Sequence, residues 1–201
     1  MTNTAANTKL DDQALDLLFR EGRTSNTFSD EPVSADTLRE IYETAKFGPT
    51  EANSQPWRIV FITTDEAKSR LLPHMSDGNR GKTATAPVVA LVAADSDFNE
   101  NMPKVFPHAP DAKNWFGDLE SRTRVAEFNT GLQVGYLITT IRAFGLAAGP
   151  MSGFDKEAVA KEFFPGKNVN VKVAINIGKP GENPWFDRLP RLDYEEAVTV
   201  L

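Results

Sequence analysis

The polar groups of this chain that could do chemistry include two segments suited to hold a phosphate. Arg23-Thr24-Ser25-Asn26 places one cation, two hydroxyls and an amide in four consecutive residues. Arginine offers forked donors and hydroxyls add single hydrogen bonds, which together suit a phosphate group. Near the C-terminus, Arg188 and Arg191 flank a Leu-Pro pair and could close over the same group. Each segment also has a simpler interpretation, as a polar loop that caps a helix and as a surface charge pair.

Two further segments offer partners for a planar polar ring. The string GPTEANSQPW (48–57) carries three side chains with hydrogen-bond donors or acceptors, Thr50, Asn53 and Gln55. Asn79 and Lys82 are three residues apart and share one face if their segment is helical. A lysine in that place could stabilise the negative charge of a reduced ring. The alternatives are an ordinary helix-to-strand connection and a solvated polar pair.

The composition removes several other kinds of chemistry. The 201 residues include no cysteine and two histidines, so thiolate catalysis, iron–sulfur clusters, cysteine-based zinc sites and three-histidine metal sites cannot be built. The net charge of −6 disfavours nucleic acid as a partner. No apolar run approaches the roughly 20 residues that span a bilayer, and the N-terminus lacks a signal-peptide pattern. We therefore expect a cytoplasmic protein without a membrane or nucleic-acid partner.

Three familiar sequence motifs are absent from the chain, although two of them have a near match. No G-x-G-x-x-G follows a predicted strand, which argues against a Rossmann dinucleotide site. GNRGKT (78–83) resembles a P-loop, but Ser76 stands where the first glycine belongs. GPMSG (149–153) resembles the nucleophile elbow of hydrolases, but Ser152 comes one place late. A serine hydrolase that uses Ser152 is therefore a minor alternative.

Hydrophobic periodicity predicts the elements that must position these segments. Helices are expected at 11–20, at 34–47 with Ser34 as N-cap, at 118–144 and at 155–164. A further short helix is expected after residue 63 and ends at about residue 72. Strands are expected at 58–63, 87–95 and 169–179, the second with both faces covered. The proline-rich, aromatic stretch 97–117 is expected to be a long functional loop or lid. The pattern predicts an α/β or α+β fold with a sheet of mixed direction, as one domain at 11–201 after a frayed, flexible segment at 1–10.

The helix predicted at 118–144 is long for a domain of this size and would span about 40 Å. Gly131 and Gly135 lie four residues apart on it. Glycine costs about 1 kcal/mol in a helix interior, so two of them indicate that another backbone approaches closely. That backbone belongs either to the same chain or to the partner in a dimer.

Taken together and in this order, the segments resemble the nitroreductase family of FMN enzymes. The matching strings are RTSN (23–26), GPTEANSQPW (48–57), NRGK (79–82), the 118–144 helix, PMSGF (150–154) and DRLP (187–190). The resemblance implies an α+β, nitroreductase-like fold with a mixed, mainly antiparallel sheet flanked by helices and a long central dimer helix. It also implies a homodimer with two FMN sites at the interface.

The resemblance assigns roles by position. The FMN phosphate or ribityl chain would be held by Arg23, Thr24, Asn26 and Arg188. The ribityl chain and the N1–O2 edge of the ring would meet Asn79 and Lys82. The segment beside flavin N5 would be Met151, Ser152 and Gly153. The other subunit would supply Pro49, Thr50, Glu51 and Asn53, and Gln55 of the same segment is also expected at the cofactor.

Three positions depart from the pattern of the family. A basic residue is common where Asn26 stands, and an acidic residue is common where Ser152 stands. A second C-terminal cation is often found two places before Arg188, where this chain has Phe186. These departures bear on individual contacts with the cofactor.

The activity that the resemblance implies is a hydride relay, from NADH or NADPH to flavin N5 and then to an aldehyde, quinone or nitro compound. Longer strings, among them RLPRLDYEEA (188–197), resemble the branch of the family that reduces malonic semialdehyde to 3-hydroxypropionate in pyrimidine degradation. His108, within the predicted lid, could meet the carboxylate of that aldehyde. A broad nitroreductase or quinone reductase and a non-catalytic flavin-binding protein are the alternatives.

Overall fold

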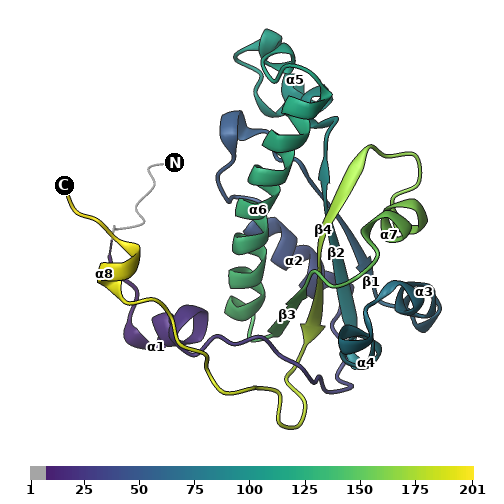
Figure 1. Cartoon of the computed structure of the whole chain (residues 1–201), viewed down its shortest axis with the longest axis vertical. Helices are drawn as coiled ribbons and strands as arrows, with labels where there is room; N and C mark the ends of the chain where they lie inside the picture. The colour runs from purple at the N-terminus through teal and green to yellow at the C-terminus, as the bar shows by residue number, and fades with distance from the viewer. Residues whose placement is uncertain (1–7) are drawn as a thin grey trace.

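The computed structural model describes residues 8–201, so the predicted flexible segment at 1–10 lies mostly outside the described residues. The body has three layers (Figure 1). Helices α2 (Ala35–Ala45) and α6 (Leu119–Ala143) cover one face of a four-stranded sheet. Helices α3 (Asp65–Leu71), α4 (Asp77–Thr85) and α7 (Lys156–Phe163) lie on the other side. Ser34 caps α2 as expected, because its hydroxyl accepts from the Thr37 N–H at 3.0 Å.

The sheet has the order β1-β2-β4-β3, and each of the three pairings is antiparallel. Its strands are β1 (Trp57–Ile62), β2 (Val88–Asp95), β3 (Ala147–Met151) and β4 (Val169–Gly178). A single parallel bridge joins Thr24 to Ala148 beside β3. The α+β class is thereby confirmed, and β2 is buried on both faces as expected. The sequence did not predict β3, because AAGPM lacks the β-branched residues that mark a strand.

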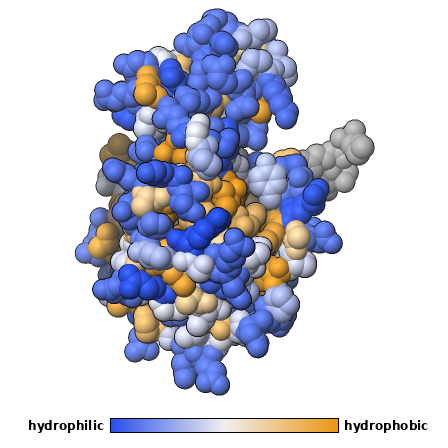
Figure 2. Space-filling view, turned by 90° about the vertical axis from the view of Figure 1, so that its right-hand side faces the viewer, coloured by the Kyte–Doolittle hydropathy of each residue, from blue (hydrophilic) through white to orange (hydrophobic). Residues whose placement is uncertain are grey.

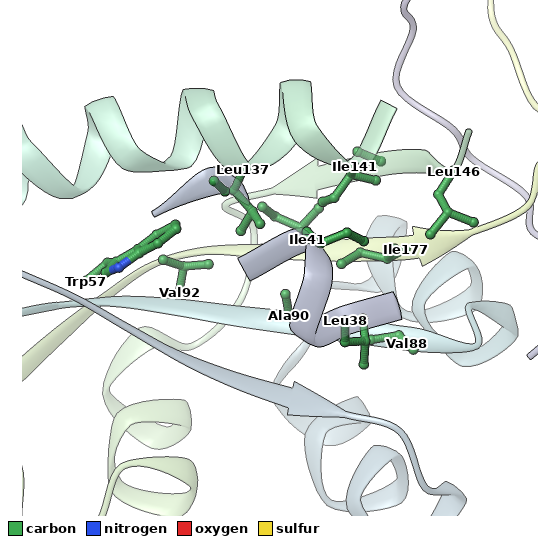
Figure 3. Packing of buried hydrophobic residues seen from close by; sticks show 13 residues of the cluster. Leu38, Ile41, Trp57, Val88, Ala90, Val92, Leu137, Ile141, Leu146 and Ile177 are labelled. Atoms are coloured by element: carbon green, nitrogen blue, oxygen red, sulfur yellow. The ribbon is translucent and has the colours of Figure 1, made fainter. Parts of the chain in front are cut away.

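The main core lies between the sheet and its two covering helices. Leu137 and Ile141 of α6 and Ile41 of α2 point toward Ile177 of β4 (Figure 3). On each helix, apolar residues recur three or four positions apart, and this spacing puts their side chains on the face that meets the sheet. Each such side chain stabilises the fold by about 1.5–3 kcal/mol through burial. This core holds the long helix against the sheet.

The outward face of α6 carries exposed apolar side chains that the described residues leave largely uncovered. Cβ atoms built at Gly131 and Gly135 would meet nothing within 4 Å, so the interpretation that these glycines serve packing inside the chain is wrong. Exposed hydrophobic side chains line the same face, namely Phe128, Leu132 and Tyr136. By contrast, the molecule seen over α3 and α7 is mostly hydrophilic, with hydrophobic side chains gathered near its middle (Figure 2).

The stretch 97–117 is not the long loop that the sequence predicts. It forms three short helices, η4 (Phe98–Asn101), α5 (Met102–Val105) and η5 (Pro110–Asn114). Phe98, Met102 and Phe116 are buried in a small core of their own, which packs near the start of α6. Phe98 and Phe116 meet edge to face, with ring centroids 4.8 Å apart. Apolar side chains at short spacing therefore fold this stretch into a cap despite its prolines.

Both ends of the described chain lie to one side of the body. The first helix is α1 (Asp12–Leu15), which continues into η1 (Asp16–Arg20) and confirms the helix expected at 11–20. After β4 the chain forms an extended tail with α8 (Tyr194–Ala197), and the tail reaches away from the sheet (Figure 1). Most of its large side chains are exposed, among them Phe186, Leu189 and Leu192. Among the described residues, no helix is both long and apolar enough to cross a membrane.

Candidate functional site

The segment 23–26, the first of the two that could hold a phosphate, lies directly beside β3. The Ser25 N–H donates to the Ala148 carbonyl at 3.2 Å, and Thr24 forms the parallel bridge to the same residue. A Cβ built at Gly149 would lie 2.8 Å from the Ser25 carbonyl oxygen. Only glycine allows this approach of two backbones. The backbone of β3 therefore fixes the position of the loop at 23–26.

The third segment meets the end of β3. Asn79 and Lys82 lie on α4, which confirms that their segment is helical. The Asn79 side-chain amide donates to the Gly153 carbonyl at 2.9 Å, and the Ser76 N–H donates to the same oxygen at 3.1 Å. A Cβ at Gly153 would lie 2.8 Å from the Asn79 amide nitrogen. The segment Met151–Gly153 and the start of α4 are thus one unit, with Ser152 exposed beside it.

The C-terminal tail closes over the first segment. The Asn26 N–H donates to the Pro184 carbonyl at 2.9 Å, and an Arg23 guanidinium nitrogen donates to the Phe186 carbonyl at 3.1 Å. Arg188 donates to the Arg20 carbonyl. Together they enclose a pocket of about 290 Å³, here called the arginine pocket, lined by Gly22, Arg23, Thr24, Asn26, Arg142, Phe186, Asp187, Arg188, Leu189 and Arg191. Segments more than 150 residues apart in the chain are brought together, as the sequence predicts for Arg23, Thr24, Asn26 and Arg188.

The arginine pocket carries an excess of positive charge. Four arginines and one carboxylate line it, and within the described part of the chain none of the four forms an ion pair. Of the seven other arginines, five have a carboxylate partner, namely Arg20, Arg58, Arg70, Arg80 and Arg124, and Arg39 and Arg122 form no ion pair with described residues. Guanidinium groups in a fixed fork are well suited to bind a phosphate. The pocket is therefore a candidate phosphate site.

The second segment, 48–55, leads into β1 at the opposite edge of the sheet. Three of its residues have left-handed backbone angles without being glycine, with φ of 46° at Ala52, 54° at Asn53 and 45° at Gln55. Such angles cost of order 1–3 kcal/mol each and occur often at functional sites. The Glu51 N–H donates to the Asn129 side-chain oxygen at 2.7 Å, which ties the segment to α6.

The side chains of this segment are partly committed to the chain itself. The Asn53 amide donates to the Val105 carbonyl at 2.7 Å and accepts from the Gln55 amide at 2.9 Å. The Gln55 N–H donates to the Thr50 hydroxyl at 3.2 Å. Pro49 and Glu51 are exposed. The exposed backbone and side chains of 49–51 are thus the groups most available to a ligand.

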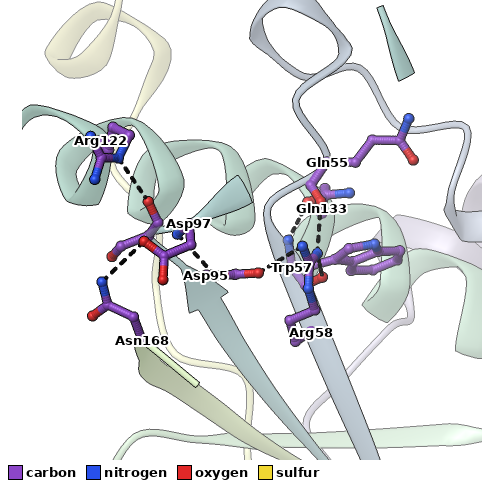
Figure 4. A network of polar contacts seen from close by, with 9 residues as sticks. Gln55, Trp57, Arg58, Asp95, Asp97, Arg122, Gln133 and Asn168 are labelled. Atoms are coloured by element: carbon purple, nitrogen blue, oxygen red, sulfur yellow. Dashed lines mark hydrogen bonds and ion pairs between the residues drawn. The ribbon is translucent and has the colours of Figure 1, made fainter. Parts of the chain in front are cut away.

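The 48–55 segment and the β3 segments lie at opposite edges of the sheet. The order β1-β2-β4-β3 separates the two edge strands by three strand spacings, or about 14 Å. Figure 4 shows the polar contacts that β1 makes at its own edge of the sheet. The Trp57 N–H donates to Gln133 of α6 at 3.2 Å, and Arg58 pairs with Asp95 of β2 at 2.7 Å. The structure thus groups the predicted site residues in two sets.

The helical cap presents aromatic rings near the 48–55 segment. The Phe106 ring lies 3.9 Å from the His108 ring and 5.8 Å from that of Trp115, measured between centroids. His108 is exposed, and the cap is linked to the 48–55 segment through Val105. No hydrogen bond joins Ser152 to either histidine in the part of the chain that the structure describes, which removes support for the serine hydrolase.

Sequence reasoning missed two residues of these sites. Arg142 lines the arginine pocket from the last turn of α6, where a cation is an ordinary feature of a helix end. Asn129 is fully buried and holds Glu51. A polar residue on the buried side of a helix was the available signal for Asn129, whereas nothing in the sequence singled out Arg142.

Comparison with known proteins gives a consistent result. The model described as the nitroreductase family matches residues 20–179. A Streptomyces griseus protein described as a candidate NADH dehydrogenase/NAD(P)H nitroreductase is 48% identical over 193 residues, which are 96% of this chain and 98% of that protein. A Caulobacter protein of the same description is 48% identical and is covered to 99%, again with 96% of this chain. The chain belongs to the nitroreductase family.

Solved structures share the fold at low sequence identity. A candidate nitroreductase from Exiguobacterium sibiricum, in complex with FMN, superimposes with a TM-score of 0.85 at 19% identity, covering 96% of this chain and 99% of that one. A candidate NAD(P)H:FMN oxidoreductase from Staphylococcus epidermidis gives a TM-score of 0.82 at 22% identity, with 96% and 98% covered. The fold is the nitroreductase fold.

Proposed function

We propose that this protein is an FMN-dependent oxidoreductase that uses NADH or NADPH as reductant. The observation that carries the proposal is the arginine pocket, in which four guanidinium groups that form no ion pair with described residues surround a space of about 290 Å³. The described residues fit the cofactor, since guanidinium groups that form no ion pair with described residues suit its phosphate, and Gly153 lets the backbone beyond β3 lie against Asn79 and Ser76, where a Cβ would come within 2.8–2.9 Å of their polar atoms. The names of the relatives point the same way, as NAD(P)H nitroreductases.

The residues divide the work of holding the cofactor. Arg23, Arg188 and the Thr24 hydroxyl would bind the phosphate, and Asn26 would orient the loop through its bonds to the tail. Asn79 and Lys82 of α4 would meet the ribityl chain and the N1–O2 edge, with Met151, Ser152 and Gly153 beside N5. When bound, FMN would supply the hydride, so no residue of the chain needs to act as a nucleophile. The carbonyl oxygen of the aldehyde would take its proton from solvent at the exposed site.

The proposed enzyme is a homodimer in which each site takes groups from both chains. The two edges of the sheet lie too far apart to complete one site within a chain. The exposed glycines and hydrophobic side chains on α6 offer a surface for a second copy, since large apolar patches on a folded protein mark interaction sites. Pro49, Thr50, Glu51, Asn53 and Gln55 of one chain would then contact the ring held by its partner.

The proposed substrate is malonic semialdehyde, reduced at its carbonyl carbon to 3-hydroxypropionate. The support is the likeness of several strings to that branch of the family, together with the exposed His108 on the cap. His108 would meet the substrate carboxylate, and Phe106 fixes its ring. We propose a cytoplasmic place for this reaction, where thiols and nicotinamides are kept reduced.

A broad nitroreductase or quinone reductase is the second candidate, because the relatives at 48% identity carry nitroreductase names. Steady-state kcat/KM with malonic semialdehyde and with a nitroarene separates the two substrates. The first proposal predicts a clear preference for the aldehyde, and a His108→Ala variant should lose that preference while its nitroarene rate is unchanged.

The flavin itself is tested before the substrate. The purified protein should be yellow, should hold close to one FMN per chain, and should oxidise NADH or NADPH in the presence of an acceptor. A protein that binds FMN but oxidises neither nicotinamide would be a non-catalytic flavin-binding protein. A colourless protein that also fails to take up added FMN would overturn the proposal.

A further inference from the structure

Arg142 is fixed at the wall of the arginine pocket by contacts that leave part of its guanidinium unused. One terminal nitrogen donates to the Leu18 carbonyl at 3.0 Å. The Nε atom is buried and has no partner among the described residues. A Cβ built at Gly22 would lie 2.6–3.0 Å from the guanidinium atoms, so the Gly22 backbone rests on the group. The side chain is therefore held in place before any ligand arrives.

The charge of Arg142 is costly in this position. Burial, and the facing charge of Arg188, lower the pKa of the Arg142 guanidinium below its ordinary value. No carboxylate within the described residues forms an ion pair with it, and the one acid on the pocket wall is Asp187. A half-buried cation beside another cation is stabilised when an anion binds between them. The geometry and the charge both indicate an anionic ligand.

The helix end offers a partial explanation that does not involve a ligand. A cation in the last turn of α6 interacts favourably with the helix dipole, by about 0.3–1 kcal/mol. That interaction requires neither a buried Nε without a partner nor a location against Arg188. It also does not explain why Arg142 shares a pocket with three further arginines that form no ion pair with described residues. A structural role alone thus leaves these three observations without a cause.

We propose that Arg142 donates directly to the phosphate group of FMN and selects the phosphorylated flavin over riboflavin. The inference rests on the proposed function, which supplies the ligand, and adds a residue that the sequence pattern did not assign. Arg142 acts from the body of the protein, whereas Arg188 acts from the tail and Arg23 from the N-terminal loop. The rigid guanidinium thereby fixes the place where the phosphate lies, and the two others close on it.

The test compares two ligands that differ by one phosphate. Flavin-free protein, prepared from the holoenzyme, is titrated with FMN and with riboflavin while flavin fluorescence is followed. We expect Arg142→Met to weaken FMN binding roughly 10- to 100-fold, as for a lost charge-assisted hydrogen bond, and to leave riboflavin binding within about threefold. Arg39→Met is the matched control, because it removes one positive charge from α2, away from the pocket.

Arg142→Lys keeps the charge and most of the stem, and so covers the case in which the methionine variant fails to fold. We expect an intermediate loss for FMN alone, since a single ammonium cannot replace the fork. Equal weakening of FMN and riboflavin would assign Arg142 a structural role and overturn the proposal, as would unchanged affinity for both. Wild-type protein that binds neither flavin would instead refute the proposed function.

Discussion

The two edges of the sheet differ in how their polar groups are used. At the β3 edge, loop 23–26 and the start of α4 lie against the end strand, and the tail closes over the loop. The four arginines of the pocket there form no ion pair with any described residue. At the β1 edge, the 48–55 segment is strained at Ala52, Asn53 and Gln55, and its amides bond to the chain itself. The first edge thus offers positive charge to a ligand, and the second offers a backbone that is held in a fixed conformation.

In the proposed function, this difference would let one fold bind the two ends of a flavin. The phosphate needs cations that the protein does not neutralise, and the arginine pocket provides them. The ring needs a surface of fixed shape, and in the proposed site the 48–55 segment would provide it, since Asn129 holds Glu51 and the Val105 carbonyl holds Asn53. Because the edges are about 14 Å apart within one chain, the comparison leads to a shared site in a dimer.

The largest effect is expected where the proposed dimer is blocked. Gly131→Arg places a long cation on the outward face of α6, where the chain itself offers open space. Two like charges that face each other across an interface cost several kcal/mol, so the dimer should dissociate and lose its FMN. Sedimentation velocity and the flavin-to-protein ratio measure both results, with Ser69→Arg on exposed α3 as the control. A Gly131→Arg protein that stays dimeric with full FMN content would remove α6 from the interface.

The next effect concerns the β3 edge. Gly149→Val should push loop 23–26 away from β3, because a Cβ there would lie 2.8 Å from the Ser25 carbonyl oxygen. We expect the free energy of unfolding to fall by about 1–3 kcal/mol and FMN affinity to fall at least tenfold. Urea unfolding and flavin titration measure the two quantities. Gly78→Ala on α4, where a Cβ meets nothing, should instead raise stability by up to about 1 kcal/mol.

A smaller effect is expected at the β1 edge. Asn129→Ala leaves the Glu51 N–H without its acceptor and should lower the free energy of unfolding by about 1–2 kcal/mol. Because the 48–55 segment would loosen, kcat/KM should fall while the phosphate contacts at the other edge keep FMN bound. A lower kcat/KM with unchanged FMN affinity would show that the two edges of the sheet act separately. Equal losses of both would mean that the edges are not independent.

The smallest effect tests the strain itself. Ala52 has a φ of 46°, an angle that glycine adopts without a steric penalty. Ala52→Gly should therefore raise the free energy of unfolding, by at most about 1 kcal/mol, because glycine also gains entropy in the unfolded chain. Chemical denaturation of the two proteins in parallel measures the change. A loss of more than 1 kcal/mol would show that the segment is not strained at this residue.

Much of the layered fold could be predicted from local patterns. The α6 and α2 helices follow from apolar spacing, and β2 follows from a buried apolar run. Strand β3 could not be predicted, since AAGPM becomes a strand only by pairing with β4. The cap at 97–117 was missed because its prolines favour a loop, whereas the packing of Phe98 against Phe116 across the cap, which stabilises its short helices, leaves no periodic pattern in the sequence.

The candidate site shows the same limit. Arg23 and Arg188 stood out because each lies in a recognisable string, and the structure lines one pocket with both. Arg142 looks in the sequence like any cation at a helix end, and only the fold carries it to the same pocket. Spatial convergence of residues from separate elements is a property of the tertiary structure, and one sequence contains no local sign of it.

The central claim is that each FMN site combines the β3 edge of one chain with the β1 edge of its partner. Mixed dimers test it directly, with Arg23→Glu in one chain, Pro49→Trp in the other, and two affinity tags to isolate the heterodimer. Each homodimer should lack FMN. Because a shared site places both lesions together and leaves the second site intact, the heterodimer should bind one FMN and show about half the wild-type activity. A heterodimer without FMN would mean that each site lies within a single chain, which contradicts the account.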